Sequence, residues 1–459
     1  MNKILVFGTG TYYEQRKEYL KNVEILAFLD NDSNKQGKML DGVEIISPEK
    51  VEMYAYDYIL LMSMYQYDMK KQLLSLNVEK NKILEYTEIG KLEGGNKKDY
   101  NQYEFHMGHV RSDMKKALLI TNNLENSGAP RALGEVGRIL LKRNYAVYLV
   151  SPVKGKMEEY CISLGMNVLI EADLGMTNKN FLHWLQNLKP DVCFINTVIY
   201  HYMINDIQKM GIPIIWWIHE NIDLPSCHFE GYRIKSMSNL RICVVGLLAR
   251  KMINEKFKIT QSTELFYGFE DRFNANANIE KKNKIVFAII GYIHPIKGQD
   301  IFVKAINMLS DSINVEAEFY IIGRVSDKNL YSELLNAALE NKNIKFIEEL
   351  SPEEMMDFYK FIDVVVCPSR CDTMPMVVAE GLMNYKACIV SDNTGFTELI
   401  IDEENGLICE AGSVMSLKNK MEWILNNPER VKNIGDNGRK LYDQYFKMEI
   451  FENHIMELI

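Results

Sequence analysis

The sequence predicts an α/β protein with mostly parallel sheets, arranged as three consecutive blocks. Apolar runs of strand length alternate with helix-length stretches along the chain, a pattern typical of strand–helix–strand units. The length of 459 residues fits about three domains. Neither a solenoid-type repeat nor a low-complexity segment interrupts this alternation.

Composition argues against several classes of protein. The formal net charge of −9 is unlike that of a general nucleic-acid binder, which usually carries a basic surplus. The N-terminal residues enter a strand directly, without the layout of a signal peptide, and no apolar run is long enough to span a bilayer. We therefore expect a cytoplasmic protein, with peripheral contact at the inner membrane face left open.

The cysteine pattern predicts reduced, buried thiols. No two cysteines form a Cys-x-x-Cys pair, and no second Cys/His pair completes a zinc site with Cys367 and Cys371. We therefore expect no metal site. The eight cysteines are Cys161, Cys193, Cys227, Cys243, Cys367, Cys371, Cys388 and Cys409.

The first block, residues 1–90, is predicted to be a small Rossmann-like domain. Gly8 and Gly10 end its first strand and Asp30 ends its second, at distances that fit a dinucleotide-binding fingerprint. Tyr13 replaces the third glycine, which makes the fingerprint weak. The block either binds a nucleotide or sugar nucleotide or serves as a docking module. Its predicted strands are Ile4–Phe7, Glu24–Leu29 and Tyr58–Met62, with a helix at Met69–Leu76. Residues 91–115 are polar, lack steady periodicity and are predicted to form a linker.

The second block, residues 116–280, is predicted to be a second parallel domain. The loop Ser127-Gly128-Ala129 follows its first strand and opens a helix at Arg131–Arg143. Its predicted strands are Ala117–Thr121, Ala146–Val150, Asn167–Ile170, Val192–Ile195, Ile212–Trp217 and Ile242–Val245. His219 leaves the strand Ile212–Trp217 at its carboxyl end, where it could hydrogen-bond a ligand, although a structural histidine fits there as well.

A local basic surplus lies between residues 231 and 260 of this acidic chain. Seven cations accompany the single acid Glu255, namely Arg233, Lys235, Arg241, Arg250, Lys251, Lys256 and Lys258. The stretch could meet an anionic lipid surface or an anionic acceptor. Solvated helix faces explain it more simply, and we favour that explanation.

The third block, residues 281–445, is predicted to be a third parallel domain, with a tail or helix at 446–459. Its predicted strands are Ile285–Ile290, Ala317–Ile322, Ile344–Phe346, Val364–Val366, Ala387–Val390 and Gly406–Ile408. Two helices follow, at Ser413–Leu425 and Glu429–Tyr445.

The loop from Gly291 to Asp300 carries Lys297 and Gly298 immediately before a predicted helix. A lysine at a helix N-terminus is locally unfavourable for the helix dipole. A bound diphosphate would relieve that cost and use the lysine as a point charge, although a solvated loop lysine remains the simpler alternative.

Two acids lie eight positions apart at another strand–loop–helix corner of the third block. Asp372 follows the strand Val364–Val366, and Glu380 lies in the helix after it. Ligands bind outside the carboxyl ends of parallel strands, and a helix N-terminus there can hold a phosphate. This layout could grip the hydroxyls of a sugar nucleotide. Glu398, in the turn from Gly395, lies beside the same cleft, in what is also an ordinary turn sequence.

These motifs resemble those of the GT-B glycosyltransferases, specifically the large retaining family 4. The resemblance extends from about Lys116 to the C-terminus and rests on motifs in matching order. They are the Gly128-Ala129 loop, the His219 strand end, Gly291 to Gly298, Pro368 to Glu380, and Gly395 to Glu398. The resemblance implies two facing Rossmann-like domains, here preceded by a further small one. It also implies that the tail crosses back onto the GT-B N-terminal domain.

The resemblance also implies roles for individual residues. Lys297 would bind the donor diphosphate, Asp372 the transferred sugar and Glu380 the ribose. Backbone N–H groups at Met374, Met376 and Val377 would cradle sugar and phosphate, and His219 would touch the donor sugar near the acceptor. Gly128, Gly291 and Glu398 would complete the nucleotide-sugar site.

Three positions depart from the family pattern. Asp372 stands where a glutamate is usual, which shortens the reach of the first acid. Tyr292 stands where an arginine often follows the glycine, so one phosphate-neutralising charge is missing, and Arg324 or Arg370 could replace it. The loop Thr373-Met374-Pro375-Met376 replaces a more glycine-rich one.

The resemblance implies a retaining transfer of a sugar from a nucleotide-diphosphate sugar to a hydroxyl acceptor. We expect this transfer to be metal-independent, because Asp30-Asn31-Asp32 lies in the wrong block to serve as a metal-binding Asp-x-Asp motif. The acceptor would be a glycan, a lipid-linked sugar or a protein in bacterial cell-surface polysaccharide, glycolipid or glycoprotein synthesis. Two alternatives stay open at this point: a non-catalytic partner subunit of a glycosyltransferase complex, and a GT-B nucleotide-sugar 2-epimerase. The sequence leaves the nucleotide, the sugar and the oligomeric state undecided.

Overall fold

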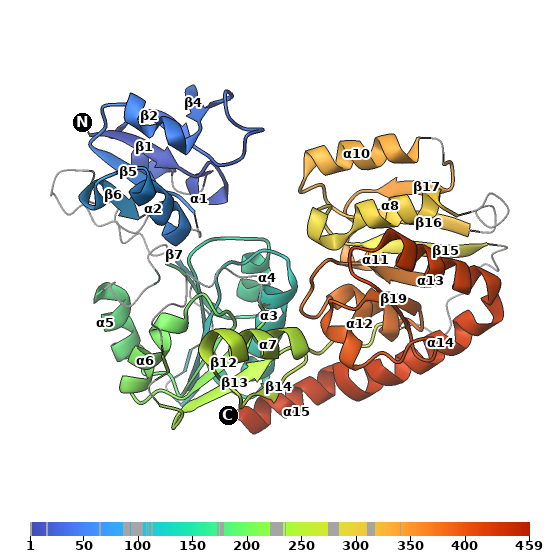
Figure 1. The fold of residues 1–459 in the computed structure, drawn as a ribbon. Helices are drawn as coiled ribbons and strands as arrows, with labels where there is room; N and C mark the ends of the chain where they lie inside the picture. Colours follow the sequence, from blue (N-terminus) through green and yellow to red (C-terminus); the bar gives the residue numbers. More distant parts are fainter. Residues whose placement is uncertain are drawn as a thin grey trace.

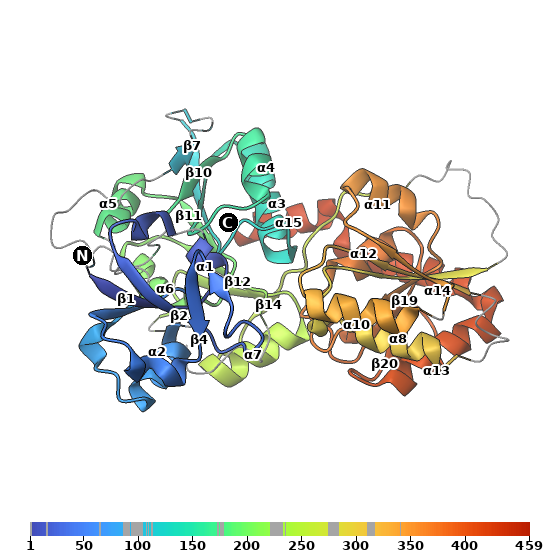
Figure 2. The same ribbon diagram turned by 90° about the horizontal axis from the view of Figure 1, so that it is seen from above.

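The computed structural model contains three parallel or mostly parallel sheets flanked by helices, which confirms the predicted α/β class. Two domains are stacked on one side of the molecule, and the third lies on the other side (Figures 1 and 2). The structure describes residues 2–14, 17–63, 66–85, 92, 104–106, 108, 110–111, 113–171, 174, 179–220, 233–234, 236–273, 284–309, 317–339 and 341–459.

The first domain is built on a six-stranded sheet in the order β3-β4-β2-β1-β5-β6. Its strands are β1 Lys3–Phe7, β2 Glu24–Leu29, β3 Met39–Leu40, β4 Val43–Ile46, β5 Tyr58–Leu61 and β6 Ile83–Glu85. Its helices are α1 Thr11–Glu14 and α2 Gln66–Ser75, with 3-10 turns at Lys17–Leu20, Pro48–Met53 and Lys80–Lys82. Alternate residues of the strands point to opposite faces, so two apolar clusters form, one on each side of the sheet.

The second domain is built on an eight-stranded sheet in the order β14-β13-β12-β11-β8-β9-β10-β7. Its strands are β7 Glu104–His106, β8 Lys115–Ile120, β9 Tyr145–Ser151, β10 Asn167–Ile170, β11 Val192–Ile195, β12 Ile214–Ile218, β13 Leu240–Val244 and β14 Thr263–Glu264. Its helices are α3 Gly128–Lys142, α4 Met157–Ser163, α5 Lys179–Leu188, α6 His201–Lys209 and α7 Leu247–Phe257. The central strands are buried on both faces, as continuous apolar runs in a parallel sheet must be.

The third domain is built on a six-stranded parallel sheet in the order β17-β16-β15-β18-β19-β20. Its strands are β15 Ile285–Ile290, β16 Ala317–Ile322, β17 Ile344–Ile347, β18 Val364–Cys367, β19 Ala387–Ser391 and β20 Leu407–Cys409. Its helices are α8 Gln299–Asn307, α10 Lys328–Ala338, α11 Pro352–Tyr359, α12 Met376–Met383, α13 Val414–Asn426 and α14 Pro428–Leu441. The strand order reverses between β15 and β18, which puts the loops after these two strands at a topological switch point.

The C-terminal helix leaves the third domain and lies against the second (Figure 1). A π-helix at Tyr442–Phe446 joins α14 to α15, which runs over Met448–Leu458. Phe451 is fully buried, with its ring 5.6 Å from that of Trp217 on β12. The side chain of Arg241 donates to the carbonyl of Glu457 at 3.0 Å. These contacts extend one apolar cluster across both domains.

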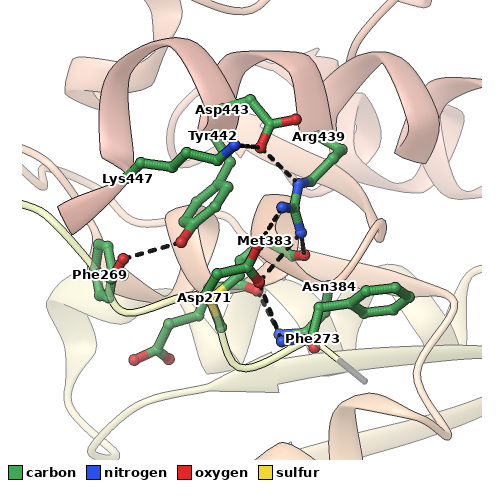
Figure 3. Close-up of polar contacts among 10 residues, drawn as sticks. Phe269, Asp271, Phe273, Met383, Asn384, Arg439, Tyr442, Asp443 and Lys447 are labelled. Atoms are coloured by element: carbon green, nitrogen blue, oxygen red, sulfur yellow. Dashed lines mark hydrogen bonds and ion pairs between the residues drawn. The ribbon is translucent and has the colours of Figure 1, made fainter. Parts of the chain in front are cut away.

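The segment that connects the second and third domains is tied to α14 by a buried arginine (Figure 3). Arg439 donates to the carbonyl oxygen of Met383 at 2.7 Å and forms an ion pair with Asp271. The hydroxyl of Tyr442 donates to the carbonyl oxygen of Phe269 at 2.9 Å. The connecting segment is thus joined to the end of α12 through α14.

The predicted linker contains a strand. β7 lies inside residues 91–115 and pairs antiparallel with β10, so that His106 lies opposite Val168. Periodicity missed it because a three-residue edge strand is too short to show an alternation, and its existence depends on the partner strand. Among the described residues, no helix is long and apolar enough to cross a membrane.

Candidate active site

The loop after β15 is shaped by two glycines with left-handed backbone angles. Gly291 has φ 147°, and Gly298, at the start of α8, has φ 77°. A Cβ atom at Gly298 would lie 2.4 Å from the carbonyl oxygen of Pro368, a distance that side chains do not tolerate. Glycine therefore lets this loop approach the loop after β18.

That close approach brings Lys297 against Asp372. The Lys297 Nζ lies 2.6 Å from Asp372 Oδ2, and both side chains are mostly buried. Burial lowers the pKa of Lys297, but the attraction of the Asp372 carboxylate raises it more, so the net pKa lies above the ordinary lysine value. The lysine therefore keeps its charge at neutral pH.

Arg370 stabilises the contact between the loops after β15 and β18 from its outer side. Its guanidinium donates to both carboxylate oxygens of Asp300, at 2.9 and 2.8 Å, and its backbone N–H donates to the carbonyl of Ile296 at 2.8 Å. This pairing commits Arg370 to the first turn of α8. Arg324 is exposed in the loop after β16.

The backbone of Asp372 is fixed by the loop after β19. Its N–H donates to the carbonyl of Asn393 at 3.1 Å, and its own carbonyl accepts from the N–H of Gly395 at 3.1 Å. A Cβ atom at Gly395 would lie 1.9 Å from the carbonyl oxygen of Thr373. The loops after β18 and β19 are thus locked together, and Asp372 is held between them.

Glu398 lies at the end of the 3-10 turn that follows β19, Gly395–Glu398. Burial and the nearby Glu264 raise its pKa, while a hydrogen bond from the backbone N–H of Leu247 opposes that rise. Leu247 is the first residue of α7, so the structure places Glu398 against the second domain.

The helix α12 begins between Asp372 and Glu380. Its N-cap residue is Pro375, and no side chain caps its first turn, where Met376 and Val377 lie half-buried. Met374, just before the helix, is buried. The uncapped N–H groups of a first helical turn attract anions.

Glu380, one turn further along α12, has two side-chain partners. The hydroxyl of Tyr359 donates to its Oε2 at 3.2 Å. On the other side, Arg131 Nη1 lies 3.6 Å from its Oε1. Arg131 belongs to α3 of the second domain, so this ion pair spans the two domains.

The N-terminus of α3 lies close to that of α12 across the gap between these domains. A Cβ atom at Gly128, the first residue of α3, would lie 3.6 Å from the sulfur of Met376. The amide of Asn196, which follows β11, donates to the carbonyl of Ala129 at 2.8 Å and fixes the start of α3. Two helix N-termini and the Lys297 charge therefore converge on one place.

His219 leaves β12 as a neutral, shielded imidazole. Its ring lies 4.4 Å from that of Trp217, and its Nε2 is buried without a partner in the part of the chain that the structure describes. Burial lowers the pKa of His219 to about 3. At neutral pH the side chain can accept or donate one hydrogen bond at Nε2, but it does not carry a charge.

Sequence reasoning did not single out Glu220, which follows His219. The hydroxyl of Thr197 donates to its Oε1 at 2.5 Å, and the backbone N–H of His219 donates to its Oε2 at 3.2 Å. Burial raises the pKa of Glu220, although these hydrogen bonds oppose the rise. The carboxylate holds the ends of β11 and β12 together; the signal in the sequence was its position beside His219.

Tyr267 was also missed. It is 2% exposed, and its hydroxyl has no partner among the described residues. Burial raises its pKa well above the ordinary tyrosine value; Asp372 and Glu380 raise it further, while Arg131 opposes them. The phenol therefore lies within electrostatic range of both acids. It sits in an apolar run, Leu265–Phe269, that carries no sequence signal of a site.

The first domain presents a separate constellation at the ends of β1 and β2. Asp30 accepts from Thr9 and pairs with Lys35 at 3.0 Å. Tyr13, in place of the third glycine, is buried against Phe28 with ring centroids 4.7 Å apart. The acid that a dinucleotide ribose would use is thus already engaged by neighbouring side chains.

Two other sequence expectations can be placed. Within the described part of residues 231–260, Arg250 pairs with Glu264, and Arg241 binds the end of α15. Residues 231, 232 and 235 lie outside the described part. Of the cysteines, the seven that the structure describes are buried, while Cys227 is not described. No group of three or more metal-ligating side chains occurs among the residues described.

Three family models match consecutive parts of the chain. Residues 1–84 match the family described as C2185-like, N-terminal. Residues 113–237 match glycosyl-transferase family 4, and residues 270–441 match the glycosyl transferases group 1.

Curated relatives show the same kinship. An uncharacterised glycosyltransferase of Methanocaldococcus jannaschii is 32% identical over 159 residues, which cover 34% of this chain and 42% of the relative. One of Haemophilus influenzae is 22% identical over 358 residues, 74% of this chain and 98% of the relative. The N,N'-diacetylbacillosaminyl-diphospho-undecaprenol alpha-1,3-N-acetylgalactosaminyltransferase of Campylobacter jejuni is 24% identical over 258 residues, 55% of this chain and 63% of the relative. The matches to the first and third relatives thus span less than two thirds of those proteins.

Solved structures share the fold of the second and third domains. Anabaena HepE in complex with UDP and glucose has a TM-score of 0.65 at 14% identity and covers 75% of this chain and 98% of its own. A glycosyltransferase of Rickettsia africae has a TM-score of 0.66 at 15% identity, with coverage of 75% and 98%. At these identities the likeness concerns the fold alone, and it confirms the expected GT-B fold.

Proposed function

Because this chain resembles glycosyltransferase family 4 and has the GT-B fold behind an additional N-terminal domain, we propose that it transfers a sugar from a nucleotide-diphosphate sugar to a hydroxyl acceptor. We further propose that the transfer retains the anomeric configuration and needs no metal ion. The acceptor would belong to bacterial cell-surface polysaccharide, glycolipid or glycoprotein synthesis. A lipid-linked acceptor is favoured because a relative is named for transfer to a diphospho-undecaprenol sugar.

One observation carries the proposal. The N-termini of α3 and α12 face each other, and the half-buried Lys297 lies beside the same corner. Two helix dipoles and a lysine provide positive potential, while Asp372 and Glu380 provide acceptors for hydroxyl groups. A ligand with a doubly charged centre and hydroxyls on both sides fits this arrangement, and a sugar nucleotide is such a ligand.

Each proposed role follows from the position of the group. Lys297 would bind the diphosphate, Asp372 the hydroxyls of the transferred sugar and Glu380 the ribose. Backbone N–H groups near Met374, Met376 and Val377 would meet the phosphate or the sugar at the start of α12. Gly128 and Gly291 would let the ligand approach the backbone.

His219 and Glu398 would act at the edges of the site. The neutral His219 imidazole would hydrogen-bond the donor sugar through its unpartnered Nε2. Glu398 would support donor binding indirectly. Its contact with α7 would hold the second and third domains in position relative to each other.

The proposed chemistry is electrostatic. The departing diphosphate gains negative charge in the transition state, and fixed dipoles with the charged Lys297 stabilise it there. The acceptor hydroxyl would attack from the face that the leaving phosphate vacates, and that phosphate would take the acceptor proton. Retention follows from same-face attack.

The test is a panel of nucleotide sugars against the wild-type protein and Glu380→Ala. One donor should raise the melting temperature and be hydrolysed slowly, and the variant should lose both effects. Product analysis with an acceptor should then show a new glycoside with the anomeric configuration of the donor, formed equally well with EDTA present.

Other outcomes separate the alternatives. An inverted product would contradict retention, and loss of turnover with EDTA would contradict metal independence. Epimerised donor would identify a 2-epimerase. A well-folded protein that binds no donor would favour a non-catalytic partner subunit.

A further inference from the structure

Arg131 is the cation that links the second domain to the donor site. It lies in the first turn of α3, where its backbone N–H donates to the carbonyl of Ser127 at 3.1 Å. Its side chain crosses to the third domain, and Nη1 lies 3.6 Å from Glu380 Oε1. The guanidinium therefore stands beside the facing N-termini of α3 and α12.

Arg131 faces an acceptor atom that a donor ribose could use. Glu380 Oε2 accepts from Tyr359 at 3.2 Å, which leaves Oε1 as the less engaged oxygen, and Arg131 Nη1 lies 3.6 Å from Oε1. A ribose hydroxyl bonded to Oε1 would share that oxygen with Arg131 and weaken an ion pair that is already long.

A diphosphate could bind a second cation in addition to Lys297. Lys297 is one charge, and it is shared with Asp372 at 2.6 Å. The 3.6 Å separation of Arg131 Nη1 from Glu380 Oε1 indicates a weak ion pair. A guanidinium released from Glu380 has a planar set of donors that matches two phosphate oxygens. Its place in the first turn of α3 puts it at the same helix terminus that faces α12.

A separate observation indicates that a ligand atom enters this space. The Tyr267 hydroxyl is buried, has no partner among the described residues, and lies within electrostatic range of Asp372, Glu380 and Arg131. Buried hydroxyls in native proteins are nearly always hydrogen-bonded. A ligand seated between the two acids would supply the missing partner.

We propose that Arg131 is a donor-binding residue that exchanges its Glu380 partner for the donor diphosphate when the ribose engages Glu380. This inference rests on the proposed function, because it presumes a nucleoside diphosphate in the cleft. It gives α3 a direct part in binding and makes recognition of the ribose the event that frees the second cation.

The exchange predicts that one substitution affects two ligands differently. In Arg131→Ala, the affinity for UDP should fall roughly 10- to 100-fold, the range expected for loss of a charged hydrogen bond. The affinity for uridine should stay equal or rise, because nothing then competes for Glu380 Oε1. Isothermal titration calorimetry with UDP, UMP and uridine measures both affinities. If the donor panel selects a nucleotide with another base, the diphosphate, monophosphate and nucleoside of that base replace these three ligands.

Two further variants complete the test. Arg131→Lys should recover part of the UDP affinity but less than the wild type, since an ammonium lacks the planar fork. Lys142→Ala removes a cation from the exposed far end of α3 and should leave all affinities unchanged. Thermal unfolding of each variant shows whether it is folded.

The failures are distinguishable. Equal weakening of UDP and uridine by Arg131→Ala, or no change in either, would overturn the exchange and leave the proposed function standing. Failure of the wild-type protein to bind any nucleoside diphosphate would overturn the proposed function and this inference with it.

Discussion

At the scale of single residues, the cleft keeps its charges paired and leaves some neutral groups without partners. Lys297 and Arg131 each face an acid, whereas the Nε2 of His219 and the hydroxyl of Tyr267 face no partner among the residues described. Pairing offsets much of the desolvation cost of a buried charge, whereas a buried polar group without a partner lowers stability. These unpartnered groups are therefore the places where a bound ligand would supply the missing hydrogen-bond partner.

Tyr267→Phe should stabilise the free protein and weaken donor binding. Loss of the unpartnered hydroxyl should raise the free energy of unfolding by about 1 kcal/mol, because no hydrogen bond is lost with it. The matched change Tyr442→Phe removes a hydroxyl that donates to Phe269, and it should lower that free energy by about 1 kcal/mol. Denaturant unfolding of both variants would show opposite signs; equal destabilisation would contradict the interpretation of Tyr267.

His219 should make the protein less stable in acid. Its pKa of about 3 in the fold lies below the unfolded value of about 6.5, so the unfolded chain binds the extra proton. Stability should therefore fall as the pH drops from about 6.5 towards 3. In His219→Phe this loss should disappear, and unfolding midpoints measured across that pH range should give a flatter curve.

The neighbour of His219 titrates in the opposite sense. Glu220 has a raised pKa, so its contribution is lost as the pH rises through that value. The difference between wild type and His219→Phe isolates the histidine. A difference that does not depend on pH would show that His219 is not held neutral by the fold.

At the scale of secondary structure elements, local patterns predicted the strand–loop–helix corners better than the contacts of the side chains that lie on them. The strand–loop–helix corners around Lys297, Asp372 and Glu380 follow from apolar runs, turn residues and helix starts, all of which are local. The partners of these groups depend on which strands are neighbours and on how two domains face each other. Glu380 meeting Arg131 is a contact of that kind, and no period in the sequence encodes it.

The elements at the domain connection show the same division. The helix over Glu429–Tyr445 was predicted from its periodicity, while the π-helix that ends it was not, because a single wide turn leaves no repeating signal. The ion pair of Arg439 with Asp271 joins residues 168 positions apart. Nothing in the sequence around Arg439 or Asp271 indicates that these two residues pair.

Arg439→Met should destabilise the protein strongly. The arginine is 7% exposed and holds Asp271, Asp443 and the carbonyl of Met383. The two carboxylates are partly exposed, so water can solvate them, but the carbonyl of Met383 loses a charged donor, and the loss should cost about 1–3 kcal/mol. Arg430→Met, on the exposed face of the same helix, should cost less than about 1 kcal/mol. Similar unfolding midpoints for the two variants would show that the buried network contributes little.

At the scale of the whole molecule, the cores divide the chain into two units rather than three. The first domain has two apolar clusters of its own, drawn from residues 4–92. The second and third domains share a cluster that runs from Ala117 to Ile455, and the third domain has a further cluster of its own on the same sheet. Domains that share a core should unfold together, and a domain with a separate core should unfold independently.

Calorimetry of the full chain should therefore show two transitions. The donor nucleotide should raise the larger transition alone, since ligand binding stabilises only the unit that binds it. Phe28→Ala, in a fully buried position of the first domain, should lower the smaller transition alone. A single transition shifted by both changes would contradict the division.

The chain crosses between the second and third domains twice, and the two crossings are bonded to each other. The N–H of Phe269 on the outward pass donates to the carbonyl of Phe446 at 2.8 Å, and the N–H of Met448 on the return pass donates to the carbonyl of Phe269 at 3.1 Å. Two connections that are hydrogen-bonded side by side should restrict sliding and twisting between the second and third domains and leave rotation about the paired crossings as the easiest movement. Such a rotation would change the distance between Arg131 and Glu380, which lie on opposite sides of the gap. That distance would then report how far the two domains have turned.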